Sequence, residues 1–147
     1  MNDARTVILH ASQNPHDVTR AVNSARHLHA AHPELDVRVI VNGSALDGLL
    51  ASGAPSAPDG VRVQACAVGL GKRGADTDAL PRGVETVPGA ITTIVEAELA
   101  GAVYVRISGV HARFSPESVF READDPLCGS RPPFARGRAA PDEETPR

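Results

Sequence analysis

Short apolar runs, rich in β-branched residues, alternate with amphipathic stretches over most of the chain. The runs predict five strands, at residues 6–10, 37–41, 61–65, 84–87 and 103–107. Asn14 followed by Pro15 is typical of a helix start, an N-cap before proline at the first helical position. Apolar residues then recur at spacings of three and four, which predicts an amphipathic helix ending near residues 32–33; its apolar stripe comprises Val18, Ala21, Val22, Ala25 and Leu28.

Two more helices follow from the same pattern. Ser44 can cap a short helix that carries Leu46, and Pro88 opens a helix closed by Gly101. The glycine-rich stretch 69–78 has no apolar period and is expected to be a long loop. Because strands alternate with helices and are apolar on both faces, we predict an α/β fold: a three-layer α/β/α arrangement around a five-stranded, mostly parallel sheet.

Composition narrows the function classes. The chain has 147 residues, 41% hydrophobic but only 3% aromatic, so one domain with a core of small aliphatic residues is expected. A net charge of −3 without a basic stripe argues against nucleic-acid or anionic-membrane partners. No apolar run approaches the roughly 20 residues of a membrane helix, and the first residues do not resemble a signal peptide. We therefore expect a cytoplasmic protein that does not enter a membrane.

The pattern changes near residue 108. We expect an α/β domain over residues 1–110 and a C-terminal extension over residues 111–147, largely disordered from about residue 126, where prolines and arginines replace core formers. Cys128 lies in this extension, either as a mobile thiol able to resolve a persulfide or as an incidentally exposed residue. Two cysteines are too few for a disulfide framework.

Candidate chemistry gathers where the predicted strands end, because ligands bind at the carboxyl ends of parallel strands. His10, Asn42-Gly43 and Cys66 occupy such positions, and Cys66 is the only strong nucleophile among them. The loop after Cys66 supplies two cations, Lys72 and Arg73, and three glycines that let backbone N–H groups turn toward an anion: Gly69, Gly71 and Gly74. Together they can favour a thiolate or persulfide at Cys66. The alternative is an inert, buried cysteine, a common fate of a free thiol.

Other site types have weaker support. Gly69, Gly71 and Gly74 have the spacing of a dinucleotide fingerprint, but the strand, helix and acidic residue that this motif requires are absent. His10 is a candidate proton donor or charge partner for Cys66, although one intervening strand would separate the two residues by roughly 10 Å. Its alternative role is a strand-end histidine bonded to backbone. No metal site is predicted, because the histidines near the end of the first helix have no complementary ligands; they are His27, His29 and His32.

Five ordered fragments of this chain resemble the DsrE/DsrF-like (YchN-like) family over about residues 5–107. They are VILHA from Val7, AVNSARHL from Ala21, VIVNG from Val39, GVRVQAC from Gly60, and the stretch from Leu80 through VPGA to YVRI at its end. The resemblance implies a compact domain with a five-stranded parallel sheet and symmetric homo-oligomers, often trimers or hexamers. In members linked to sulfur relay, a cysteine ending the third strand carries sulfur as a persulfide, and Cys66 matches that position. Transfer between donor and acceptor proteins would need no redox cofactor.

The chain departs from the family pattern after the cysteine. Many relatives have a polar residue, usually asparagine, two positions later, where this chain has Val68. We therefore carry two hypotheses: an intracellular sulfur carrier, or possible sulfurtransferase, that uses Cys66, and a noncatalytic oligomeric module that binds a small ligand or a protein.

Overall fold

The structure, a computed structural model, describes residues 5–109. The predicted extension and Cys128 lie outside these residues. In chain order the described elements are β1 (Thr6–Ala11), α1 (Pro15–Ala31), β2 (Asp36–Val41), the 3-10 turn η1 (Gly43–Ala45), α2 (Leu46–Leu50), β3 (Val61–Cys66), α3 (Ala67–Gly71), the 3-10 turn η2 (Thr77–Ala79), β4 (Val84–Val87), α4 (Ala90–Leu99) and β5 (Val103–Ile107).

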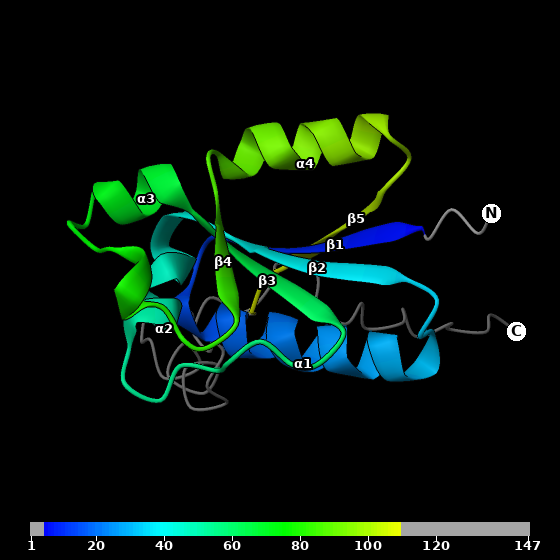
Figure 1. Ribbon diagram of the computed structural model, residues 1–147, viewed down its shortest axis with the longest axis horizontal. Helices are drawn as coiled ribbons and strands as arrows, with labels where there is room; N and C mark the ends of the chain where they lie inside the picture. Colours follow the sequence, from blue (N-terminus) through cyan, green and yellow to red (C-terminus); the bar gives the residue numbers. More distant parts are fainter. Residues whose placement is uncertain (1–4, 110–147) are drawn as a thin grey trace, which may run out of the picture. The chain divides into compact units, whose positions relative to one another are not determined.

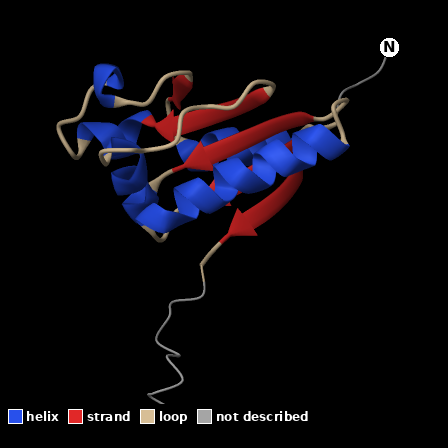
Figure 2. Ribbon diagram, turned by 90° about the horizontal axis from the view of Figure 1, so that it is seen from below, coloured by secondary structure: helices blue, strands red, loops and turns tan. Residues whose placement is uncertain are grey.

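The five strands form one sheet in the order β4-β3-β2-β1-β5, and every neighbouring pair is parallel. Helix α4 lies on one side of this sheet and α1 on the other (Figure 1), while Figure 2 shows the long helix α1 in front of the sheet and running roughly along its strands. The α/β class and the parallel sheet predicted from the sequence are thus confirmed. All strands end at the same edge, so the residues that follow them meet there.

The α1 face holds the larger part of the core. Asn14 caps the helix in a capping box with Asp17, whose carboxylate accepts hydrogen bonds from the backbone N–H of Asn14 (3.2 Å) and of Gly109 (2.7 Å). The predicted apolar stripe of α1 packs on alternate residues of β1, β2 and β3, as strand geometry requires. The buried partners on the sheet are Val7, Leu9, Ala11, Val37, Val39, Val41, Val61, Val63 and Ala65.

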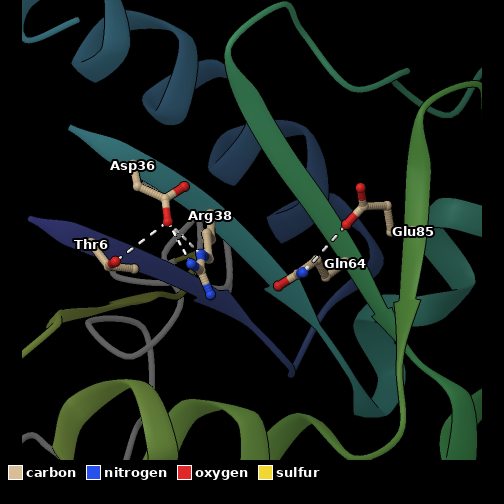
Figure 3. A network of polar contacts seen from close by, with 5 residues as sticks. All are labelled: Thr6, Asp36, Arg38, Gln64 and Glu85. Carbon is tan, nitrogen blue, oxygen red and sulfur yellow. Dashed lines mark hydrogen bonds and ion pairs between the residues drawn. The ribbon is translucent and has the colours of Figure 1, made fainter. Parts of the chain in front are cut away.

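The α4 face is apolar only at its centre. Ile8, Ile40 and Cys66 pack there under Ala90 and Ile94 of α4. Around this patch the strands carry polar groups, which Figure 3 shows as two sets: Thr6, Asp36 and Arg38 on β1 and β2, and Gln64 and Glu85 on β3 and β4. The expectation of strands apolar on both faces was therefore wrong for this face, because the ten-residue α4 covers only part of it.

Two local predictions need correction. The stretch expected to be a long loop contains the end of α3 and the turn η2, and α3 begins directly after β3. The last predicted helix begins at Ala90 with Gly89 as its N-cap rather than at Pro88. Among residues 5–109, no helix has the length and apolar character needed to cross a membrane.

Candidate functional site

His10 is the best-connected polar side chain at the carboxyl edge of the sheet. It is 7% exposed, and both ring nitrogens have partners: Nδ1 lies 2.7 Å from the Tyr104 hydroxyl and Nε2 lies 2.9 Å from Asn42 Oδ1. An amide oxygen can only accept, so Nε2 carries the proton that it donates. In the neutral ring Nδ1 then accepts from the Tyr104 hydroxyl. The alternative of a histidine bonded to backbone is wrong, because its recorded partners are side chains.

Cys66 ends β3 on the same face of the sheet. Its residue is 8% exposed, and it belongs to the apolar cluster under α4. It is the one cysteine among residues 5–109, and it has no disulfide there. The thiol therefore sits at the predicted strand end, but against aliphatic side chains rather than in an open cleft.

Strand register places Asn42 between His10 and Cys66. Val41 pairs with Ala65, so the next residues, Asn42 and Cys66, are level on neighbouring strands. Asn42 keeps an extended backbone (φ −144°, ψ −175°), and its N–H donates to Ala11 O at 3.1 Å, so it continues β2 by one residue. Strand β2 separates β1 from β3. This is the intervening strand the sequence analysis anticipated, and Asn42 at its end reaches His10.

Arg73 holds the loops at this edge together. Its guanidinium bonds to Asp47 on α2 (2.7 Å), to Gly43 O (2.9 Å) and to Gly69 O (3.2 Å). The hydrogen bond from Arg73, more than their charge attraction, holds the pKa of Asp47 below its usual value, while the same bond raises the pKa of Arg73. The expectation that Arg73 favours a sulfur anion on Cys66 electrostatically stays a prediction. Its hydrogen bonds show that Arg73 fixes the loop that follows Asn42.

The predicted glycines play different parts. Gly43 has φ +56°, and a Cβ there would lie 2.6 Å from Ser12 O. Only glycine fits this position easily, and it lets the chain make a sharp turn immediately after Asn42. A Cβ on Gly69 would lie 2.4 Å from Leu46 Cδ1 and 3.9 Å from the Cβ of Cys66. Because glycine has no Cβ, α3 can pack closely against α2. Gly71 faces open space, and Lys72 is exposed with no ion pair among the described residues.

The histidines near the end of α1 do not gather into a site. His32 pairs with Glu34 at 3.2 Å, and the His29 ring lies against Gly60. Within residues 5–109 no group of three histidine, cysteine or acidic side chains could hold a metal ion.

Tyr104 is the site residue that the sequence analysis missed. Alternation along β5 puts Tyr104 on the same face as Arg106. Alternation does not show which strand lies beside β5. The register shows that β5 lies beside β1, with Tyr104 level with Ile8 and Arg106 level with His10. The Tyr104 ring centroid is then 5.7 Å from that of His10.

Comparison with solved structures identifies the fold. Residues covering 71% of this chain match 99% of MTH1491, a protein of unknown function from Methanobacterium thermoautotrophicum, with a TM-score of 0.56 and 23% identity. The ychN protein from E. coli matches with a TM-score of 0.53 and 20% identity, over 69% of this chain and 98% of that one. The chain has the fold of ychN. No family model and no curated protein sequence matches it. The DsrE-like resemblance is thus supported for the fold, and at these identities the likeness does not extend to activity.

Proposed function

We propose that this protein is a cytoplasmic sulfur carrier that holds sulfur as a persulfide on Cys66. The observation that carries the proposal is the position of the thiol, at the carboxyl end of β3, level with Asn42 and on the same face as the hydrogen-bonded His10. The ychN-like fold is consistent with it, since the DsrE-like resemblance of the sequence implies a carrier cysteine at the end of the third strand.

The transfer needs no external oxidant. The Cys66 thiolate attacks the outer sulfur of a donor persulfide R–S–SH, the new S–S bond forms, and the donor's S–S bond breaks. The donor leaves as a thiolate and takes up the proton that Cys66 lost. The overall exchange is Cys66–SH plus R–S–SH giving Cys66–S–SH plus R–SH. An acceptor thiolate then removes the outer sulfur by the same reaction.

A hollow lined by residues that neighbour Cys66 in the chain and in the sheet, but not by Cys66 itself, is the approach route in this proposal. Val68, Pro88 and Gly89 line it together with Thr92, Thr93 and Glu96 of α4. Val68 follows Cys66 by two residues, and Pro88 follows Val87, the register partner of Cys66 on β4. Because Cys66 is only 8% exposed, a donor must either reach the thiol's small exposed edge or wait for local opening of α4, whose Ala90 and Ile94 pack on it.

The test uses the full chain with Cys128→Ser, so that Cys66 is its one thiol. After reduction and incubation with a small-molecule persulfide donor, mass spectrometry should find one added sulfur atom on Cys66. This sulfur should pass to an added acceptor thiol, and no adduct should form in Cys66→Ser. A chain that stays unmodified while a free cysteine peptide in the same tube is loaded would contradict the proposal.

Burial of Cys66 favours a second candidate function, a noncatalytic module that binds a ligand or protein at the same strand ends. The thiol packs against Ile8, Ile40 and Ile94, and Arg73 is held by Asp47. In this case Cys66 is a packing residue. The loading experiment separates the two functions, because a module of this kind takes up no sulfur.

Self-association is part of either function. Helix α4 exposes an apolar stripe at spacings of four residues: Ile91 (60% exposed), Val95 (47%) and Leu99 (84%). We propose that this stripe lies between subunits of a homo-oligomer, a trimer or hexamer as the family resemblance implies. Sedimentation should show the oligomer and its loss in Leu99→Glu; a monomeric wild-type chain would contradict this.

A further inference from the structure

The amide orientation of Asn42 is fixed by its neighbours. Oδ1 accepts the proton of His10 Nε2 at 2.9 Å, and the opposite nitrogen of that ring is bound by the Tyr104 hydroxyl at 2.7 Å. With Oδ1 committed to the β1 side, the NH₂ group of the planar amide points away from His10. No hydrogen bond to this NH₂ group is recorded within residues 5–109, so two donors are free beside the strand that carries Cys66.

The backbone at Asn42 is held as firmly as its side chain. Its N–H donates to Ala11 O, and the carbonyl of Gly43, the next residue, accepts from Arg73 at 2.9 Å. Gly43 itself fits closely against Ser12 O. The free donors of Asn42 are therefore pre-organised rather than mobile.

Gln64 gives an independent sign that a polar group belongs on this part of the sheet. It is 8% exposed and lies two residues before Cys66 on the same face, and Nε2 donates to Glu85 at 3.5 Å. The carboxylate thereby fixes this amide too, and Oε1 remains buried with no hydrogen-bond partner. Figure 3 shows this oxygen on the side of Gln64 away from Glu85, toward β2, the strand that leads to Asn42. A buried acceptor left in this way calls for an occupant that donates a hydrogen bond.

We infer that Asn42 is the hydrogen-bond donor for sulfur bound on Cys66, with His10 and Tyr104 as positioning residues that hold its amide. This inference rests on the proposed carrier function and specifies how the site would hold its cargo. Asn42 thus offers a fixed donor level with Cys66, and Gln64 offers a buried, unpartnered acceptor two residues before it on the same face. A sulfur atom that alternates between S⁻ and S–H can use both a donor and an acceptor, so we assign the ligand class as a thiolate or persulfide.

The decisive variant is Asn42→Asp in the Cys128→Ser chain. Aspartate keeps an oxygen to accept from His10 Nε2 but replaces the free donors with a second acceptor. Because hydrogen bonds to charged groups are among the stronger ones, we expect sulfur loading of Cys66 to slow by tenfold or more. The matched control is Asn23→Asp, the same change at an exposed position of α1, where Asn23 bonds only to Arg26 among its recorded partners. The control should load at the wild-type rate.

A spectroscopic readout separates this role from a structural one. In the wild-type chain the side-chain NH₂ resonance of Asn42 should shift when Cys66 is loaded, while that of Asn23 stays in place. His10→Phe removes the group that orients Asn42 and should slow loading several-fold, while urea unfolding checks that the variant is folded.

The outcomes of these experiments are distinct. If the wild type and Asn42→Asp load sulfur at the same rate, and the Asn42 resonance does not shift, the role of Asn42 is overturned and the carrier function stands. No loading of the wild type at all overturns the carrier function. In that case alkylation of the Cys66 thiol decides the inference about Asn42. Slower alkylation in Asn42→Asp but not in Asn23→Asp supports it, and equal rates overturn it.

Discussion

Replacing Gly48 with alanine should destabilise the protein, although alanine is the better helix former. Gly48 lies inside α2, where alanine is favoured over glycine by roughly 1 kcal/mol. A Cβ at this position, however, would lie 2.1 Å from Pro15 O and 2.9 Å from its carbonyl carbon. These are backbone atoms in the first turn of α1, so they cannot move aside as a flexible side chain would. Overpacking of this kind typically costs about 1–3 kcal/mol.

We therefore expect Gly48→Ala to lower the free energy of unfolding by about 1–3 kcal/mol, out of a total of roughly 5–15 kcal/mol for a domain of this kind. Urea unfolding followed by circular dichroism should show the midpoint falling by about 1 M at an ordinary slope. The matched control is Gly71→Ala at the end of α3, where no atom lies within 4 Å of the added Cβ. Its midpoint should stay the same or rise. A Gly48→Ala midpoint at or above wild type would refute the close packing of α2 on α1.

Two further predictions concern the loops and the patch around the thiol. The hydrogen bond from Arg73 lowers the pKa of Asp47, so its stabilising effect is present above the usual aspartate value and is lost as the pH falls through the lowered value. Arg73→Ala should return the Asp47 titration, followed by carboxyl NMR, to the usual range; an unchanged midpoint would contradict the ion pair. Ile94→Ala should cost about 2–5 kcal/mol and speed alkylation of Cys66, because Ile94 is 5% exposed and packs on the same patch. Thr19→Ala, at an exposed position of α1 away from this patch, should do little, and equal effects of the two would speak against this packing.

The five strands of the sheet could be predicted from the sequence because each strand has its own local pattern of apolar residues. The bounds of β4 and β5 are as predicted, and β1, β2 and β3 each extend the predicted strand by one residue. Asn14 and Pro15 predicted the start of α1, where a cap and a fixed φ act within one turn. These features depend on neighbours in the chain, which is why the sequence alone reveals them.

Helix α3 was missed because its stability comes from tertiary contacts. Gly69 and Gly71 lower helix propensity, yet Gly69 is what lets this turn pack closely against Leu46. Arg73 then ties the turn to Asp47, which is 26 residues earlier in the chain. No local sequence pattern indicates that Arg73 and Asp47 form an ion pair.

The site was only half predictable for a related reason. His10, Asn42 and Cys66 could be expected at one edge, because parallel strands all end there. Tyr104 could not be assigned to it, since its partnership with His10 depends on β5 lying beside β1 rather than beside β4. The role of Arg73 as a clamp on the loops likewise depends on where α2 lies.

Packing alone does not account for the hydrogen-bonded group of His10, Asn42 and Tyr104. A buried imidazole with both nitrogens satisfied adds little stability over apolar side chains of similar shape, since the bonds that it gains replace bonds to water. The neighbouring patch of Ile8 and Ile40 shows that this face of the sheet accommodates aliphatic residues readily. What the polar group supplies and an aliphatic one would not is orientation, because it leaves the amide donors of Asn42 at a fixed place level with Cys66. In the proposed carrier, this fixed donor would stabilise the negative charge that the Cys66 sulfur holds as a thiolate or persulfide.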